Sequence, residues 1–446
     1  MTLEEYYEFV KVSDVSKGQS VGKRRRIGVL GLVSEIGSVL AALKKSSLLG
    51  DNGLNAKIVR GALKEEIGDA IWYAIMLSQI LEDEDYLDKK YSKDIFRADI
   101  KMLHSELSGS SENQAKVQKT LGDVNVKKFL KEADSFLKKS KPRMNEYQNT
   151  AFITARTEGA ELRDICAALL LQLSAQCIRE FLPASELKIN DELRVRPVAE
   201  TIGKIVWHLS ALAKLHKLSL HEIIERNVEK AEFRNQAGSI SKRYDVNYDL
   251  DQQFPKKFEI RFTDTGEQKA IMTWEQDNGI SKKLGSELTD NNYDGDGYRF
   301  HDVMHISFAV HLGWSPNLRS FMERKRKDRN SEKNDSVDMV EDGGRAKILE
   351  EMVILQVHTH AQKLEDHLGK DNVISPFENE GALGFEFLQK LHELTRGHEV
   401  EANPVQDWRE AIKQGYDCFY KLKQNDGGTI LADMHSRKIS FRPLEN

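Results

Sequence analysis

Residues 31–40, GLVSEIGSVL, and residues 63–73, LKEEIGDAIWY, share one sequence pattern. Each has apolar residues at helical spacing, interrupted by carboxylates on the side that should be buried. Residues i and i+3 share one face of an α-helix, so Glu66 and Asp69 project together beside an apolar stripe. No Lys or Arg lies at helical spacing inside either stripe. Buried charges persist when they are paired or bind a metal, so the pattern favours a divalent cation.

Magnesium is the ion that best suits such acids. It prefers carboxylate oxygens, keeps several waters and accepts its remaining ligands from the phosphates of a substrate. The alternative interpretation is a solvated helix edge on which acids recur by chance. The residues alone leave both interpretations open.

The two segments resemble the MazG family of all-α nucleoside triphosphate pyrophosphohydrolases. That family carries an E-x-x-E motif, a spacer and an E-x-x-D motif, whose acids bind Mg²⁺ around the triphosphate. Here Glu35 begins the first pair, and Ser38 takes the place of its second acid. After 27 intervening residues, Glu66 and Asp69 form the second pair. The resemblance implies that Glu35, Glu66 and Asp69 are catalytic and bind Mg²⁺, with Mn²⁺ as an alternative ion.

Ser38 departs from the family motif, because a hydroxyl group stands where the family has a carboxylate. The missing charge implies weaker Mg²⁺ binding and lower activity. Glu65 is a candidate substitute, although a shift of one residue turns a side chain by roughly 100° around a helix.

Composition narrows the class of protein. The 446 residues are enough for two or three domains, each with its own core. A net charge of −5 disfavours nucleic-acid binding. Apolar runs such as residues 70–77 are shorter than the ~18 residues of a membrane span, and the acidic residues 1–5 do not resemble a signal peptide. With three cysteines in no paired spacing, these features predict a cytoplasmic protein without a membrane partner.

The N-terminal half contains two similar segments. Residues 143–152 repeat the opening pattern of residues 1–10, and residues 199–209, AETIGKIVWHL, align with residues 64–74, KEEIGDAIWYA. Similar segments in the same order predict an internal duplication. The expected fold is therefore mainly α, with tandem MazG-like helical bundles that pair as a pseudo-dimer.

The second copy lacks the acids of the first. Thr201 and Lys204 stand where the first copy has Glu66 and Asp69, and Gln172 lies near the place of the first-pair acid. A lysine at a ligand position repels Mg²⁺. We therefore expect no metal at the second copy itself.

A capping box at residues 219–222, SLHE, predicts a helix that carries Asn227 and Lys230. This helix resembles the closing helix of the family, in which an Asn and a Lys face the nucleotide, so the resemblance implies substrate-binding roles for both residues. The corresponding place in the first copy is the acidic segment 81–85, LEDED. The two copies are then complementary, with metal acids from one and Asn227 and Lys230 from the other. The alternative is that both residues lie on an ordinary helix surface.

The sequence pattern changes beyond about residue 245. Residues 258–262 and 271–274 predict a β-hairpin around a turn at 264–266. A second strand pair is expected at residues 429–431 and 439–441. Helices between these strands complete a smaller, mostly helical α+β domain.

Two histidines in this domain have the spacing of metal ligands. His301 and His305 lie at i and i+4, with Asp302 beside the first, which suits a transition metal on one helix face. Glu350 and Glu351 are candidate additional ligands. The alternative is that the spacing arises by chance and that His305 is a hydrogen-bonded core residue.

The C-terminal region resembles the extension found on some bacterial MazG-like proteins, and this resemblance implies no activity for it. Its basic run, residues 324–327, could bind phosphate, although such runs usually lie on solvated faces. Four parts are expected: a MazG-like repeat with metal acids at residues 1–100, a Lys-rich helical linker at 101–142, a degenerate repeat at 143–240 and the C-terminal domain at 250–446.

Three functional hypotheses follow. The first is Mg²⁺-dependent hydrolysis of a nucleoside triphosphate to the monophosphate and pyrophosphate, for nucleotide-pool control or for nucleotide depletion in phage defence. The second is a nucleotide-sensing or interaction protein with a weakened site. The third places metal-dependent chemistry in the C-terminal domain. The expected partner is a nucleoside triphosphate of unspecified base and sugar. A homo-oligomer is also among the expectations.

Overall fold

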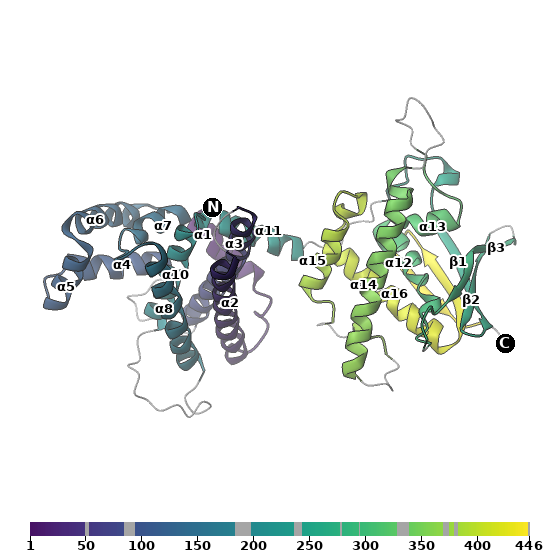
Figure 1. Ribbon diagram of the computed structural model, residues 1–446, viewed down its shortest axis with the longest axis horizontal. Helices are drawn as coiled ribbons and strands as arrows, with labels where there is room; N and C mark the ends of the chain where they lie inside the picture. Colours follow the sequence, from purple (N-terminus) through teal and green to yellow (C-terminus); the bar gives the residue numbers. More distant parts are fainter. Residues whose placement is uncertain are drawn as a thin grey trace. The chain divides into compact units, whose positions relative to one another are not determined.

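The chain forms two compact units, Met1–Ala231 and Glu232–Asn446, in a computed structural model (Figure 1). Residues 1–49, 53–83, 94–182, 198–235, 243–276, 279–293, 295–327, 339–368, 374–378 and 382–444 are described. The described residues are mainly helical, with one five-stranded antiparallel sheet in the second unit, which confirms the predicted fold class. The division between units falls inside helix α11 (Leu220–Asn235), N-terminal to the expected boundary at residues 240–250.

The first unit is built from helices around one apolar core. Before α11, they are in chain order α1 (Leu3–Ser13), α2 (Val21–Leu49), α3 (Gly53–Asp83), α4 (Ile95–Ser108), α5 (Glu112–Leu121), α6 (Asp123–Lys138), α7 (Met144–Phe152), α8 (Gly159–Phe181) and α10 (Val198–Leu215).

Helices α2 and α3 lie side by side and carry the two acidic segments (Figure 1). The helices bury Leu32 and Ile36 on α2 and Ile67 on α3. They approach closely at Gly31, where a Cβ atom would lie 2.3 Å from the ring of Tyr73. Only glycine fits there, so residues 31–40 are placed directly against α3.

Helix α2 differs from the expectation that no segment is long enough to cross a membrane. Among the described helices, it alone meets that criterion by length and composition, because an 18-residue stretch within Val21–Leu48 has a mean hydropathy of 1.7. A buried core helix can meet the same criterion, and 39% of that stretch is buried inside the protein.

Residues 101–142, expected to be a linker, belong to the first unit. They contain most of α4 together with α5 and α6. Phe129, Ala133 and Phe136 of α6 are buried in the common core, and lysines such as Lys127 lie on its exposed face. The Lys-rich composition therefore reflects the solvent side of an amphipathic helix.

Matching contacts occur in the two halves of the first unit. Trp72 of α3 donates its indole N–H to Ser13 Oγ at the end of α1, over 2.9 Å. Trp207 of α10 donates its indole N–H to Thr154 Oγ1, just beyond α7, over 3.0 Å. The contact between α1 and α3 and the contact between α10 and the end of α7 are therefore of the same kind.

The closing helix of each half packs against the other half. Helix α11 meets α3 at Gly68, where a Cβ atom would lie 3.4 Å from Asn227 Cβ. Helix α4 meets α10 at Gly203, where a Cβ atom would lie 3.6 Å from Asp99 Cβ. A glycine at each crossing allows the two helices to approach.

A buried tyrosine completes each crossing. Tyr6 donates its hydroxyl proton to Asn227 Oδ1 over 2.9 Å, and Tyr147 donates its own to Asp99 Oδ2 over 2.8 Å. By its packing, the counterpart of α11 is therefore α4. The segment 81–85 was expected at this place. Its residues 81–83 are the last turn of α3, and residues 84–85 lie outside the described residues.

The second unit combines a sheet with helices. In chain order its elements are η1 (Leu250–Gln252), β1 (Lys257–Gly266), β2 (Lys269–Glu275), β3 (Ser281–Thr289), η2 (Tyr298–Phe300), α12 (Val303–Leu312), α13 (Pro316–Phe321), η3 (Val340–Asp342), α14 (Gly344–Leu368), η4 (Pro376–Glu378), α15 (Phe385–Leu394), η5 (Glu399–Ala402), α16 (Val405–Gln424), β4 (Gly427–Asp433) and β5 (Lys438–Arg442).

The strand order is β3-β2-β1-β4-β5, with every neighbouring pair antiparallel. The hairpin β1–β2 and the pair β4–β5 confirm the predicted strands. Strand β3 was not predicted, because Leu284 is its only fully buried residue and its sequence lacks the alternation of a half-buried strand.

Helices α12 and α16 pack on the β4–β5 side of the sheet. Every side chain of α12 is buried, so this helix lacks the polar stripe of an amphipathic helix. It begins directly after Asp302 and carries His305 into the interior of the unit.

Candidate functional site

The predicted acids Glu35, Glu66 and Asp69 lie where α2 contacts α3. Glu35 and Glu66 share a side-chain hydrogen bond. Burial raises the pKa of Glu35 to about 7, and the negative charges of Asp69 and Glu66 act in the same direction. Burial also raises the pKa of Glu66. Negative charge is therefore crowded at this point, and a bound cation would relieve the crowding.

Helix α11 brings two residues of the second half to these acids. Asn227 Nδ2 donates to Asp69 Oδ1 over 2.6 Å. Lys230 Nζ lies 2.8 Å from both Asp69 Oδ2 and Glu65 Oε1. Glu35, Glu66, Asp69, Asn227 and Lys230 thus form one cluster, although 192 positions separate Glu35 from Asn227 in the numbering of the chain.

Tyr6 positions Asn227 in this cluster through a hydrogen bond. Its hydroxyl group donates to Asn227 Oδ1, which leaves the amide of Asn227 to donate to Asp69. The ring of Tyr6 is fully buried. Sequence reasoning assigned Tyr6 only to the apolar face of its helix. The available signal was its hydroxyl group, since a buried tyrosine usually finds a hydrogen-bond partner.

Position 38 lies one turn beyond Glu35 on α2, and the serine there is half-buried. Glu65, the candidate substitute, is engaged by Lys230, and 45% of its side chain is exposed. The cluster therefore has Glu35, Glu66 and Asp69 as its more buried acids, with Glu65 at its rim.

The corresponding positions of the second half carry different chemistry. Thr201 is fully buried, and Lys204 forms an ion pair with Glu200 one turn earlier on α10. Lys204 and Gln172 line a cavity of about 700 Å³ between α4, α8 and α10. Asp99 also lines this cavity, with Oδ1 buried and without a hydrogen-bond partner among the described residues.

Asp99 provides a pH-dependent stability prediction. Burial raises the pKa of its carboxyl group to about 7, opposed by the hydrogen bond from Tyr147 and the charge of Lys204. The folded protein then binds more protons than the unfolded chain, so its free energy of unfolding falls as pH rises from about 4 to 7 and stays low above pH 7. At pH 8, Asp99→Asn should stabilise the protein by about 2 to 4 kcal/mol.

The measurement is thermal unfolding of wild type and Asp99→Asn at pH 5 and pH 8. The two proteins should differ much more at pH 8, where only the wild type carries a buried charge. An equal effect of the substitution at both pH values would show that Asp99 does not titrate between them.

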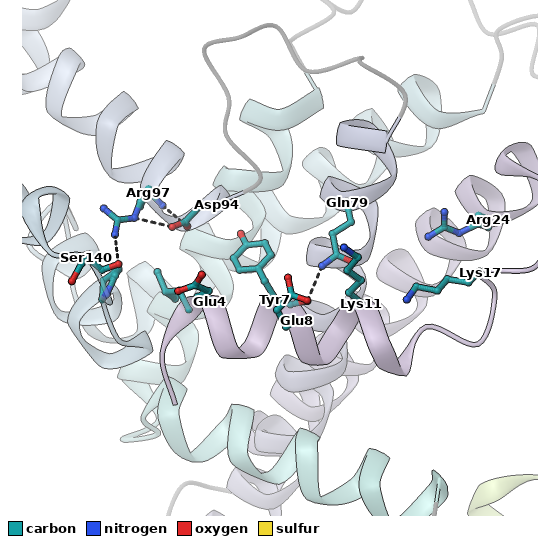
Figure 2. Close-up of a pocket in the computed structure, with 12 residues that line it drawn as sticks. Glu4, Tyr7, Glu8, Lys11, Lys17, Arg24, Gln79, Asp94, Arg97 and Ser140 are labelled. Atoms are coloured by element: carbon teal, nitrogen blue, oxygen red, sulfur yellow. Dashed lines mark hydrogen bonds and ion pairs between the residues drawn. The ribbon is translucent and has the colours of Figure 1, made fainter.

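A second cavity of about 310 Å³ lies against α1 (Figure 2). Its lining includes Tyr7, Gln79, Asp94 and Arg97. Gln79 donates to the backbone carbonyl of Tyr7, and Arg97 forms an ion pair with Asp94. None of the predicted site residues lines this cavity, and the acids of α2 and α3 line neither cavity.

Two residues of the basic run at 324–327, Arg324 and Arg326, make contacts inside the second unit. Arg326 is 1% exposed and forms ion pairs with Asp342 and Glu399, both over 2.7 Å. Arg324 donates to the backbone carbonyls of residues 250 and 253. Both arginines therefore hold the second unit together.

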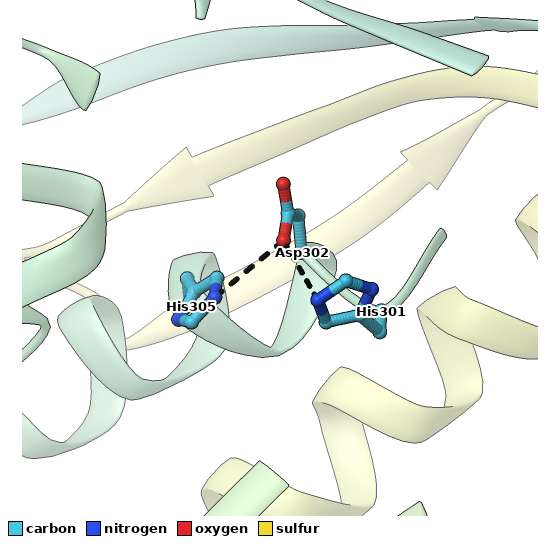
Figure 3. Close-up of side chains that lie close together, drawn as sticks. All are labelled: His301, Asp302 and His305. Carbon is cyan, nitrogen blue, oxygen red and sulfur yellow. Dashed lines mark ion pairs between the residues drawn. The ribbon is translucent and has the colours of Figure 1, made fainter. Parts of the chain in front are cut away.

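The predicted C-terminal ligands also come together. Figure 3 shows the side chains of His301, Asp302 and His305 close together. One ligand atom from each lies within 4.8 Å of the others. Glu350 and Glu351 of α14 both contact His305. The loop before α12 and the start of α14 thus form a second polar cluster, in the second unit.

Residues 239–445 match the family described as the MazG C-terminal domain. This match supports a MazG-related protein. Neither the curated proteins nor the solved structures contain a match to the chain.

Proposed function

We propose that this MazG-related chain is a Mg²⁺-dependent hydrolase that converts a nucleoside triphosphate into the monophosphate and pyrophosphate, for nucleotide-pool control or for nucleotide depletion in phage defence. The observation that carries the proposal is the convergence of Glu35, Glu66 and Asp69 with Asn227 and Lys230. This arrangement places anionic metal ligands beside a cation and an amide that suit a phosphate-bearing ligand.

The proposed architecture is a pair of MazG-like repeats that fold as an intramolecular pseudo-dimer. Its support is the matched contacts of the two halves. Trp72 and Trp207 make the same kind of hydrogen bond, and Gly68 and Gly203 allow the same kind of helix crossing. The first repeat supplies the acids, and α11 of the second repeat completes the site.

In this proposal Glu35, Glu66 and Asp69 hold Mg²⁺, which would neutralise the triphosphate and lower the pKa of a bound water. Glu35 orients the attacking water and accepts its proton. Lys230 balances the charge of Asp69 and Glu65 when no nucleotide is bound. Its flexible stem allows the ammonium group to turn towards a phosphate.

The direct test is a screen of nucleoside triphosphates with the full-length protein, with and without Mg²⁺, in which pyrophosphate release is measured. Turnover that requires Mg²⁺ supports the proposal. Nucleotide binding without turnover would favour a nucleotide sensor instead, and Ser38 is the residue that motivates this second candidate, because it removes one acid from the site.

The contribution of α11 can be tested without changing any charged residue. A Cβ atom at position 68 would already lie 3.4 Å from Asn227 Cβ and from Ile223, so the extra methyl groups of Gly68→Val should push α11 away from Asp69. Displacement by about 1 Å can lower turnover about 100-fold. We expect turnover to fall at least about 10-fold, measured as pyrophosphate release.

Gly203→Val is the matched control, because position 203 is the corresponding crossing of α4 with α10. Both variants should lose about 1 to 3 kcal/mol of stability through overpacking. Only Gly68→Val should lose activity beyond the loss explained by stability. Equal loss of activity in both variants would remove α11 from the proposed site.

A further inference from the structure

His301 and His305 both direct ring atom Nε2 towards one point, because Nδ1 of each ring has another partner. His301 Nδ1 lies 2.8 Å from the backbone carbonyl oxygen of Tyr298. His305 Nδ1 lies 2.8 Å from Glu350 Oε1. An acceptor beside Nδ1 favours the tautomer whose proton is on Nδ1, which leaves the lone pair of Nε2 available to a metal.

Two carboxylates face these Nε2 atoms. Asp302 Oδ1 lies 3.1 Å from His301 Nε2 and 3.5 Å from His305 Nε2 (Figure 3). Glu351 lies 3.1 Å from His305 Nε2 through Oε1 and 3.7 Å from His301 Nε2 through Oε2. Ligand atoms of His301, Asp302 and His305 therefore lie close together, and Glu351 approaches the two imidazoles through a different oxygen for each. The separations of 3.1 and 3.5 Å between Asp302 and the two Nε2 atoms are close to those between the ligands of a four-coordinate ion with bonds of about 2.1 Å.

The cluster holds more carboxylates than its buried histidine can balance. His305 is fully buried, and the carboxylates of Asp302, Glu350 and Glu351 all lie within 3.5 Å of its ring nitrogens. Asp302 and Glu350 are also buried. Buried charges persist when they are paired or bind a metal, so a divalent cation would compensate this excess of negative charge.

Glu350 has a different role from Glu351. Its oxygens accept from Ser315 Oγ over 2.6 Å and from the backbone N–H of Asn317 over 2.9 Å, and it contacts His305 on the Nδ1 side. Glu350 therefore lies behind the histidine, where a carboxylate orients a ligand rather than binding the metal.

We propose that His301 Nε2, His305 Nε2, Asp302 and Glu351 form a binding site for one divalent transition-metal ion, with Glu350 as a positioning residue. Two imidazoles and two carboxylates are a donor set for Zn²⁺, Mn²⁺ or Fe²⁺ rather than for Mg²⁺. The Glu351 side chain is 43% exposed and the other three ligands are at most 14% exposed. The ion is thus held from the interior and approached from solvent on the Glu351 side. This site is separate from the acids of the first unit.

The test uses the full-length untagged protein. Its metal content is measured by elemental analysis, and its affinity for Zn²⁺ is measured by competition with a chromogenic chelator after metal removal. Wild type should bind one Zn²⁺ per chain at this site. His301→Ala and Glu351→Gln should each weaken binding at least about 10-fold, and Glu350→Gln should weaken it about 10- to 100-fold through the orientation of His305.

Glu351→Gln keeps the test independent of folding, because this side chain is half-exposed and glutamine has nearly the same size and shape as glutamate. His311→Ala is the matched control, since His311 is a buried imidazole on the same helix but outside the cluster. Glu66→Gln should leave Zn²⁺ binding unchanged, which distinguishes this site from the proposed Mg²⁺ site. A wild type that takes up no Zn²⁺, Mn²⁺ or Fe²⁺, or a Glu351→Gln variant that binds as tightly as wild type, would overturn the proposal.

Discussion

Glu66→Gln should lower Mg²⁺-dependent pyrophosphate release by more than about 100-fold. Loss of a residue that only orients a metal ligand costs about 10- to 100-fold, and loss of a ligand should cost more. The substitution removes a negative charge from a crowded cluster in which burial already raises the pKa of Glu66. The melting temperature should therefore stay the same or rise while activity is lost.

The measurement is steady-state pyrophosphate release at several Mg²⁺ concentrations. Asp69→Asn should behave in the same way, because its carboxylate faces the same point and contacts Asn227 and Lys230. Glu200→Gln is the control, since this acid lies on α10 of the second half and pairs with Lys204. If Glu66→Gln and Asp69→Asn both turned over like wild type, the chemistry would lie elsewhere in the chain.

Arg326→Met should destabilise the second unit by about 3 to 5 kcal/mol. The guanidinium group bridges Asp342 and Glu399, with contacts to two oxygens of each carboxylate. Asp342 is fully buried. Methionine fills a similar volume but removes the cation that both carboxylates share. Of the cations in the described part of the chain, Asp342 then keeps only Arg319, at the longer distance of 3.7 Å, and a buried charge that has lost its close partner is the costly product of breaking such a pair.

Urea unfolding of the full-length protein, with the second unit followed through its own transition, measures this effect. Arg261→Met is the matched control, because Arg261 is 49% exposed and pairs with Glu275 at 3.8 Å. Such exposed pairs contribute less than about 1 kcal/mol. Equal effects of the two substitutions would show that the Arg326 network contributes no more than a surface pair.

The local elements could be predicted from the sequence. Alternation around Phe258 and Phe262 predicts β1, and the segment from Ile271 predicts β2, because each strand has one buried face. Helical spacing predicts α2 and α3 with their acids on one side. These predictions succeed because short-range periodicity reports directly which face of an element is buried.

The partner of each closing helix was decided by tertiary packing. The acidic segment 81–85 was expected to correspond to α11, but its residues 81–83 are the last turn of α3, and α4 makes the crossing with α10 that resembles the crossing of α11 with α3. Asp99 and Asn227 are buried polar residues of the two closing helices. No local sequence pattern indicates which residue of the other half each of them contacts. Helix crossings depend on surfaces that are distant in the chain, so local patterns do not determine them.

The same division applies to charge. Helix geometry fixes neighbours within one or two turns, so the shared face of Glu66 and Asp69 and the meeting of His301, Asp302 and His305 could be predicted from the sequence. Packing between distant segments brings Lys230 to Asp69, buries Arg326 and places Glu350 at Nδ1 of His305 and Glu351 at its Nε2. The physical reason is that the environment of a charge comes from the elements packed against it, and adjacent residues such as Glu350 and Glu351 point in different directions from the same helix.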